Sequence, residues 1–93
     1  MRHTNIIAVD IDGIITQEKN LAGEEVPNQF NIDKINSLYS NNIIILYTSR
    51  DISLRYQTIN QMKKFGVKYH DIVFNKLQYD IIIDDKAKLL EEL

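Results

Sequence analysis

Residues 5–12 read NIIAVDID, and Gly13 follows them. The run is rich in isoleucine and valine, does not alternate between apolar and polar residues, and ends abruptly in acid and glycine. This profile is typical of a short strand buried on both faces, as the strands of a parallel sheet are. We therefore expect the first strand of an α/β fold here, with carboxylates at its carboxyl end.

Three further runs have the same character, at residues 43–48, 71–74 and 79–84. The last of them again ends in adjacent carboxylates, so the sequence predicts four strands in all. Residues 14–27 fit neither a strand nor a helix period and contain the only proline. We expect an exposed loop or a small hairpin there.

Two segments with helical spacing lie between the predicted strands. Apolar residues recur every three or four positions in 32–39 and in 52–65, which gives each segment an apolar stripe that can pack on the sheet. Asn31 is the predicted N-cap of the first helix, and Gly66 is placed to end the second. Residues 87–93 are expected to form a final helix.

This order of elements predicts a small three-layer, Rossmann-like α/β domain, in which helices cover both faces of a mostly parallel four-stranded sheet. The 93 residues are expected to form one domain, residues 1–93, because a second core would lack the apolar residues to fill it. A composition of 44% hydrophobic and 26% charged residues excludes wholesale disorder and a fibrous repeat.

Composition also excludes several classes of function. The absence of cysteine rules out disulfides, a thiolate zinc site and a cysteine nucleophile, and is compatible with a reducing cytoplasm. A formal net charge of -2 provides no field for non-specific nucleic-acid binding. The apolar runs are too short to span a bilayer, and no signal-peptide stretch is visible. We expect a soluble cytoplasmic protein that does not bind membranes.

In an open parallel sheet, ligands bind outside the carboxyl ends of the strands. The residues at those ends are Asp10, Asp12, Thr48, Ser49, Arg50, Lys76, Asp84 and Asp85. Side chains two apart on a strand share a direction, so Asp10 and Asp12 can reach one point if the extended geometry continues to Gly13. Converging carboxylates repel one another unless a cation joins them, and oxygen ligands favour a hard ion such as Mg²⁺.

These residues resemble the four motifs of the haloacid dehalogenase-like (HAD) superfamily of phosphatases and phosphotransferases. The motifs are a strand ending DxDx[TV], a strand ending in Ser or Thr, an isolated Lys, and a strand ending in acids. The chain offers DIDGI at 10–14, then Thr48, Lys76 and Asp84-Asp85, in the same order and over nearly its whole length. Ile14 departs from the usual Thr or Val.

The resemblance implies a phosphomonoesterase. Asp10 would attack phosphorus and form an aspartyl-phosphate, and Asp12 would protonate the leaving oxygen and then deprotonate water. To begin as an acid, Asp12 needs a raised pKa, which the neighbouring carboxylate favours and a metal opposes. Thr48 and backbone amides would hydrogen-bond the phosphoryl oxygens, and Lys76 would neutralise the developing charge.

The resemblance also implies a magnesium cofactor. Asp84, Asp10 and the backbone carbonyl of Asp12 would hold Mg²⁺, with Asp85 beside it, either directly or through water. Ser49 and Arg50 would complete the substrate-binding set. For Arg50, a salt bridge to a nearby acid, Asp51 or Asp85, is an equal alternative.

Many HAD enzymes carry a cap domain, but no interval between these motifs has room for one. The chain therefore resembles a minimal, capless member. Such proteins act on large substrates or borrow a neighbouring subunit as a lid, so residues 17–27 would contact a second copy in a homo-oligomer. The stretches YTSRD and FNKLQYDIIIDDKA also look like those of small capless members associated with sugar phosphates and bacterial surface polysaccharides.

Three alternatives to this interpretation stay open. The acids at strand ends could be ordinary helix caps or turn residues. The chain could also be a non-catalytic binding or regulatory module that retains the fold. A phosphatase acting on nucleic-acid ends is permitted by an open site but is unsupported by the charge balance.

Overall fold

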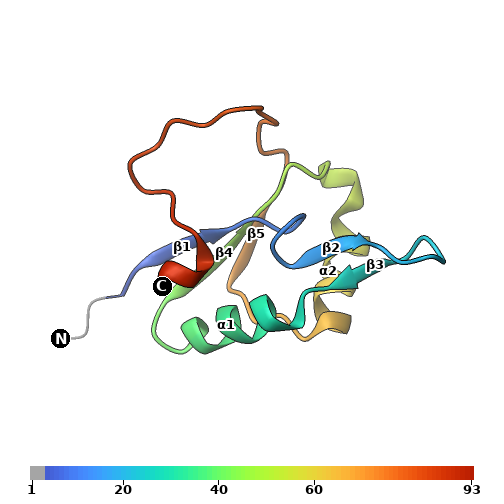
Figure 1. Cartoon of the computed structure of the whole chain (residues 1–93), viewed down its shortest axis with the longest axis horizontal. Coiled ribbons are helices and arrows are strands. Elements are labelled where there is room, and N and C mark those ends of the chain that lie inside the picture. The colour runs from blue at the N-terminus through green and yellow to red at the C-terminus, as the bar shows by residue number, and fades with distance from the viewer. Residues whose placement is uncertain (1–3) are drawn as a thin grey trace.

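The computed structural model describes residues 4–93, which form a parallel sheet, a separate hairpin and two helices (Figure 1). Two short 3₁₀ turns, η1 and η2, complete the fold. The elements in chain order are β1 (Ile6–Val9), β2 (Thr16–Lys19), β3 (Glu25–Pro27), α1 (Gln29–Tyr39), β4 (Ile43–Tyr47), η1 (Ile52–Leu54), α2 (Arg55–Phe65), β5 (Asp71–Val73) and η2 (Leu90–Glu92).

The sheet contains three of the four predicted strands, all parallel, in the order β1-β4-β5. In its register Ile6 pairs with Ile43, and Ile45 pairs with Asp71. The central strand β4 buries Ile44 and Leu46 completely, but Ile43 and Tyr47 on its other face are 37% and 39% exposed. The prediction that this strand is buried on both faces is therefore wrong. Within residues 4–93, no helix is long and apolar enough to cross a membrane.

Helix α1 begins earlier than the sequence predicts. Its N-cap is Asn28, whose side-chain oxygen accepts a hydrogen bond from the Asn31 backbone N–H at 3.1 Å. The prediction of Asn31 as the cap is therefore wrong, because that side chain instead donates to the Ile14 carbonyl oxygen and ties the helix to the turn after β1. Helix α2 ends at Gly66, as predicted, with φ at 73° in the left-handed region that glycine tolerates.

One core joins the sheet to the helices. Its buried apolar side chains are Val9, Ile11, Ile15, Ile32, Ile35, Ile44, Leu46, Met62 and Val67. Because β1, β4 and β5 follow one another in a single direction across the sheet, and such crossovers are right-handed, α1 and α2 cover the same face. The prediction of helices on both faces is wrong for the described part of the chain.

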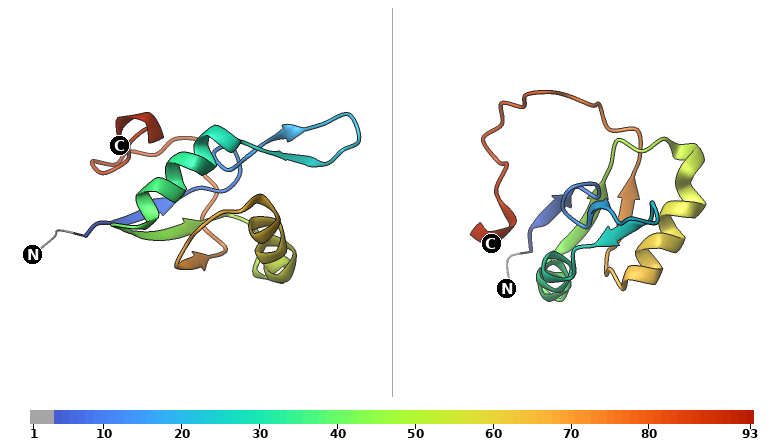
Figure 2. Two further views of the ribbon diagram at one scale, coloured as in Figure 1. Left: turned by 90° about the horizontal axis from the view of Figure 1, so that it is seen from below. Right: turned by 45° about the vertical axis from the view of Figure 1, so that its right-hand side comes forward.

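The predicted fourth strand at residues 79–84 is not formed. Figures 1 and 2 show this part of the chain as an arch that stands away from the sheet, and Ile81 and Ile83 are 81% and 98% exposed. The Lys76 backbone N–H donates to the Thr48 carbonyl oxygen at 2.9 Å, which fixes the chain at the carboxyl edge of the sheet. Three extended residues reach only about 10 Å, too short to return to the amino edge and begin a parallel strand at Tyr79.

The end of the chain returns to the body of the domain. The predicted helix at 87–93 is reduced to the 3₁₀ turn η2, whose Leu90 packs against the core. The Lys34 ammonium group donates to the Leu93 carbonyl oxygen and joins this turn to α1. The segment 77–89, defined here as the C-terminal arch, is therefore held at both ends.

Residues 14–27 contain the small hairpin that the sequence allowed. Strands β2 and β3 pair antiparallel, with Thr16 opposite Pro27 and Lys19 opposite Glu25. Only Thr16 of β2 is buried, and the hairpin projects from the body of the domain (Figure 2).

Candidate functional site

The loops that follow β4 and β5 are fastened to each other at the carboxyl edge of the sheet. Besides the bond from Lys76 to Thr48, the Asn75 N–H donates to the Arg50 carbonyl oxygen at 2.9 Å. The Asn75 side chain in turn accepts the Ile52 N–H at 3.1 Å. Asn75 adopts a φ of 61°, a conformation that asparagine tolerates better than most residues. These bonds place Lys76 next to the end of β4.

The chain turns sharply after β1. The Ile11 carbonyl oxygen accepts hydrogen bonds from the N–H groups of Ile14, Ile15 and Thr16, and Gly13 has a φ of 98°. The extended geometry therefore does not continue to Gly13, contrary to the expectation from the sequence. Asp10 and Asp12 leave the strand on either side of the fully buried Ile11.

Asp10 is half-buried at the end of β1. Burial raises the pKa of its carboxyl group, and the charge of Lys76 partly offsets this rise. The neighbouring Asp12 carboxylate raises the pKa of Asp10 a little further. The charges of Lys76 and of Asp12 therefore both act on the Asp10 carboxyl group.

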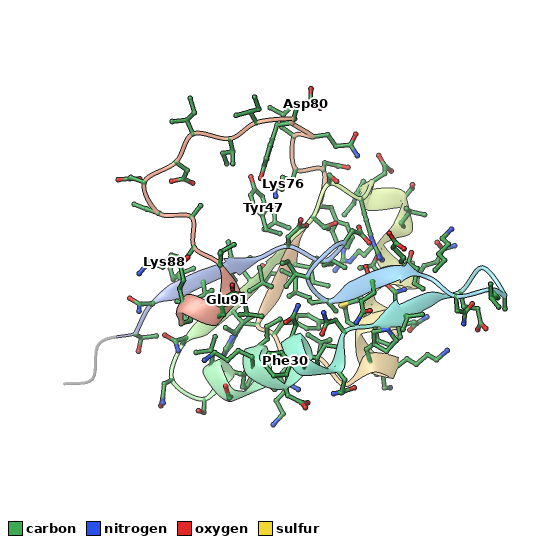
Figure 3. All side chains as sticks on the ribbon, viewed as in Figure 1. Phe30, Tyr47, Lys76, Asp80, Lys88 and Glu91 are labelled. Atoms are coloured by element: carbon green, nitrogen blue, oxygen red, sulfur yellow. The ribbon has the colours of Figure 1, made fainter. Side chains whose placement is uncertain are left out.

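The Lys76 ammonium group lies over two aromatic rings. Its Nζ atom is 5.1 Å from the centroid of Tyr47 and 5.2 Å from that of Tyr79. Figure 3 shows the Lys76 and Tyr47 side chains close together above the sheet. Such cation–π contacts hold the ammonium group in place without supplying a negative partner, so its charge remains available to Asp10.

The Arg50 side chain makes the largest number of hydrogen bonds in the site. Its Nε donates to Asp12 Oδ2 at 3.1 Å, and its Nη2 donates to Asp12 Oδ1 at 2.8 Å. The same Nη2 donates to Glu25 Oε2 at 2.9 Å. The salt-bridge partners of Arg50 are therefore Asp12 and Glu25. Asp51 and Asp85, the two acids that the sequence suggested, form no salt bridge with Arg50.

Helix α2 supplies the remaining partners of Arg50. Its Nη1 donates to Thr58 Oγ1 at 3.2 Å and to Gln61 Oε1 at 2.8 Å, and Gln61 Nε2 donates to Glu25 Oε2 at 2.7 Å. Sequence reasoning missed Glu25, Thr58 and Gln61. The only local signal is that Thr58 and Gln61 lie three residues apart and so share one face of a helix.

These contacts decide the charge of Asp12. The hydrogen bonds from Arg50 lower the pKa of the Asp12 carboxyl group, and the hydroxyl of Thr16, which donates to Asp12 Oδ1 at 3.1 Å, lowers it further. A role as proton donor, which the resemblance implies, needs a raised pKa for Asp12. The structure gives the opposite direction because a guanidinium group, and not the other carboxylate, is its closest charged neighbour.

The two predicted hydroxyl residues differ in exposure. Thr48 is completely buried, and its Oγ1 accepts the Arg50 backbone N–H at 3.1 Å. Ser49 is half-buried beside it. The Thr48 hydroxyl therefore shapes the turn after β4, and it has no open path to a ligand in this arrangement.

Asp84 and Asp85 do not join the cluster. Both lie exposed on the C-terminal arch, where Asp84 Oδ1 accepts the Lys86 backbone N–H at 2.8 Å. Within the described residues, no group of three or more histidine, cysteine, aspartate or glutamate side chains is placed to hold a metal ion. As arranged here, the four predicted ligands Asp10, Asp12, Asp84 and Asp85 do not form one Mg²⁺ site, because Asp84 and Asp85 lie exposed on the C-terminal arch.

A hollow of about 730 Å³ lies between Asp12 and the hairpin. Its lining includes Gly13, Gln17, Lys19 and Glu25. Of the two hollows lined by described residues, only this one includes Asp12 in its lining. The hairpin forms one of its walls.

Comparison with known proteins supports the fold. The sequence matches no protein-family model and no curated protein. The structure is similar to the crystal structure of a structural-genomics target from Vibrio cholerae, with a TM-score of 0.73 and 21% sequence identity. The similarity covers 96% of this chain and 86% of that chain. The chain therefore shares a small α/β fold with that protein.

Proposed function

We propose that the protein is a phosphatase of the HAD type, which hydrolyses phosphomonoesters through an aspartyl-phosphate. The observation that carries the proposal is the placement of a lysine charge beside a half-buried aspartate at the end of β1. In this arrangement Lys76 is held by its backbone bond to Thr48 and by two rings, and its charge acts on Asp10. A preorganised cation beside a carboxylate is what attack on a phosphate dianion requires.

The proposed reaction has two steps. In the first, a carboxylate oxygen of Asp10 bonds to phosphorus, the ester P–O bond breaks, and the leaving oxygen takes a proton from Asp12. In the second, Asp12 removes a proton from water, whose oxygen displaces Asp10 from phosphorus and releases inorganic phosphate. Lys76 stabilises the charge that gathers on the phosphoryl oxygens in both steps.

The hydrogen bonds that Asp12 accepts bear on its proposed role in proton transfer. Both oxygens of its carboxylate accept hydrogen bonds from Arg50, and Oδ1 also accepts the Thr16 hydroxyl. A carboxylate held in this way keeps its negative charge and has little tendency to take up a proton. Asp12 must therefore part from Arg50 before it protonates a leaving group.

In this proposal the binding of Mg²⁺ depends on the formation of the fourth strand. Mg²⁺ would supply charge neutralisation at the phosphoryl group, and Asp10 with Asp84 would hold it. Since Asp84 lies on the C-terminal arch, this set requires the arch to move and the bond from Lys76 N–H to Thr48 to open. The free edge of β1 and the exposed isoleucines of 81–83 favour pairing of this segment as a fourth strand.

The hollow beside Asp12 bears on the choice of substrate. A wall lined by Gln17, Lys19 and Glu25 suits a leaving group rich in hydroxyls, which supports a small sugar phosphate as substrate. We place the enzyme in the cytoplasm, as the sequence leads us to expect, with a second copy at the hairpin as the accompanying proposal for its assembly.

One observation favours a second candidate. Arg50 engages the carboxylate that the phosphatase mechanism needs, and the arch carries Asp84 away from Asp10. A non-catalytic module that keeps the fold for binding would tolerate both features.

A phosphatase assay separates the two candidates. Hydrolysis of p-nitrophenyl phosphate and of a panel of sugar phosphates is measured with Mg²⁺ and with EDTA. We expect turnover that needs Mg²⁺ and disappears in Asp10→Asn, which keeps the shape of the side chain without its charge. Asp80→Asn, an exposed change on the arch, is the matched control. No turnover on any substrate supports the binding module, and full activity of Asp10→Asn excludes the aspartyl-phosphate.

A further inference from the structure

The guanidinium group of Arg50 has no spare donor. It carries five N–H bonds, and it makes five hydrogen bonds, to Asp12, Glu25, Thr58 and Gln61. The side chain is only 13% exposed. An anionic substrate therefore gains a bond from Arg50 only by displacing one of these partners, which argues against the role in substrate binding that the sequence suggested.

The partners of Arg50 come from three separate parts of the fold. Asp12 belongs to the turn after β1, Glu25 to the hairpin, and Thr58 and Gln61 to α2. Glu25 is the side chain that ties β3 to the body, because its Oε2 accepts from both Arg50 and Gln61. Beyond Thr16 the residues of β2 are exposed, and those of β3 are half-buried.

A single nitrogen atom, Nη2, binds Asp12 and Glu25 at once, at 2.8 and 2.9 Å. We propose that Arg50 is a positioning residue that couples the hairpin to Asp12, so that the hairpin opens and Asp12 is released in one event. The coupling itself is a property of the fold. Its consequence for catalysis rests on the proposed function, in which Asp12 must leave Arg50.

The physical basis is the sign of the interaction between the two carboxylates. Without Arg50, Asp12 and Glu25 are like charges and disfavour each other. With Arg50 between them, each carboxylate orients the guanidinium group so that it can also bind the other carboxylate, and each contact therefore favours the other. The coupling between these two side chains therefore has opposite signs in the presence and in the absence of Arg50.

A double-mutant cycle measures this coupling without using activity. Amide hydrogen exchange in β2 and β3 is compared among wild type, Asp12→Asn, Glu25→Gln and the double variant. We expect each single change to speed exchange in the hairpin by about tenfold, as for loss of a charge-assisted hydrogen bond, and the double variant to add little more. The His70 N–H, which donates to the Ile44 carbonyl oxygen, should keep its rate. Additive effects of the two changes would overturn the proposal.

Two controls isolate Arg50 from other causes. Glu24→Gln removes the same charge one residue away and should leave hairpin exchange unchanged. Thr16→Val removes the side-chain hydrogen bond from Thr16 to Asp12, and the coupling of Asp12 to Glu25 should survive it. In an Arg50→Gln background the favourable coupling should vanish or change sign. If that background does not fold, the cycle in the presence of Arg50 still decides the matter.

A spectroscopic signal distinguishes coupling from simple support of the hairpin. The Arg50 Nε–H binds Asp12 alone, whereas Glu25 touches only Nη2. We expect Glu25→Gln to shift the Nε–H resonance of Arg50 and to speed its exchange with solvent, whereas Glu24→Gln does neither. An unmoved resonance would mean that Glu25 supports the hairpin without reaching Asp12. Neither measurement involves turnover, so absence of phosphatase activity and absence of coupling are separate results.

Discussion

Two carboxylates only two residues apart, Asp10 and Asp12, occupy opposite environments. Asp10 is half-buried, and burial raises its pKa more than the charge of Lys76 lowers it. The Asp12 side chain is 51% exposed and bound by Arg50, so its pKa falls. The two acids flank the turn at Ile11, where Asp10 is influenced by the charge of Lys76 and Asp12 binds the Arg50 and Thr16 side chains.

Replacement of Asp10 by Asn tests the environment of this carboxylate. Because burial opposes its charge at neutral pH, we expect the melting temperature in EDTA to stay constant or rise, by up to about 5 °C, equivalent to about 1 kcal/mol in so small a domain. Thermal melts of wild type, Asp10→Asn and Asp80→Asn measure the change. If Asp10 were a structural cap, its loss would instead cost about 1–3 kcal/mol.

Lys76 offers a kinetic test that depends on its charge. We expect Lys76→Met to lower kcat on p-nitrophenyl phosphate by about 100-fold and to change KM much less, because the ammonium group meets charge that concentrates during transfer. Lys76→Arg keeps the charge and should retain more of the activity. A change confined to KM would make Lys76 a ground-state binding residue.

The elements illustrate what a sequence can predict. The runs at 43–48 and 71–74 became strands because each follows a helix that returns the chain to the amino edge of the sheet. The run at 79–84 has the same composition, but it follows Lys76 with no helix between them. Apolar character is a local property and was predicted correctly, whereas pairing depends on where the preceding residues leave the chain.

Amide exchange in the C-terminal arch tests whether the proposed fourth strand forms. In EDTA the amides of residues 80–84 should exchange rapidly, because the arch lacks strand pairing in the structure. With millimolar Mg²⁺ they should become protected, if Asp84 joins Asp10 and the segment pairs with β1. Asp84→Asn should abolish this protection and Asp80→Asn should keep it. Activity that needs Mg²⁺ without any protection here would show that the metal is held without the arch.

At the scale of the whole molecule, polar contacts join parts that are distant in sequence. The position of Asp10 and Lys76 at one edge was predictable, because carboxyl ends of parallel strands meet there. The partners of Arg50 were not, because Glu25 and Gln61 lie 25 and 11 residues from it and meet only after the hairpin docks on α2. Sequence reasoning therefore predicted the edge where Asp10 and Lys76 lie, but the pKa of Asp12 shifts in the direction opposite to the one that its predicted role needs.

The two acids also give the stability of the whole domain a characteristic pH dependence. Asp12 has a pKa in the folded protein that lies below its ordinary value of 3.8, so it contributes stability that is present above pH 3.8 and is lost as the pH falls through the lower, folded value. Asp10 has a folded pKa above 3.8 and contributes with the opposite sign. Its charge costs stability at neutral pH, and this cost disappears as the pH falls through the raised value.

Melting temperatures between pH 3 and pH 6 should therefore distinguish Asp10→Asn from Asp12→Asn. This range includes the ordinary pKa of both acids, 3.8. Relative to wild type, Asp12→Asn should be least stable at pH 6 and should converge with it as the pH falls, because the wild type loses the Arg50 contact. Asp10→Asn should show its greatest advantage at pH 6 and lose it in acid. Asp80→Asn corrects both curves for the change in net charge. Parallel curves for all three variants would contradict the opposite assignment of the two carboxylates, because they would mean that neither acid changes its proton affinity when the chain folds.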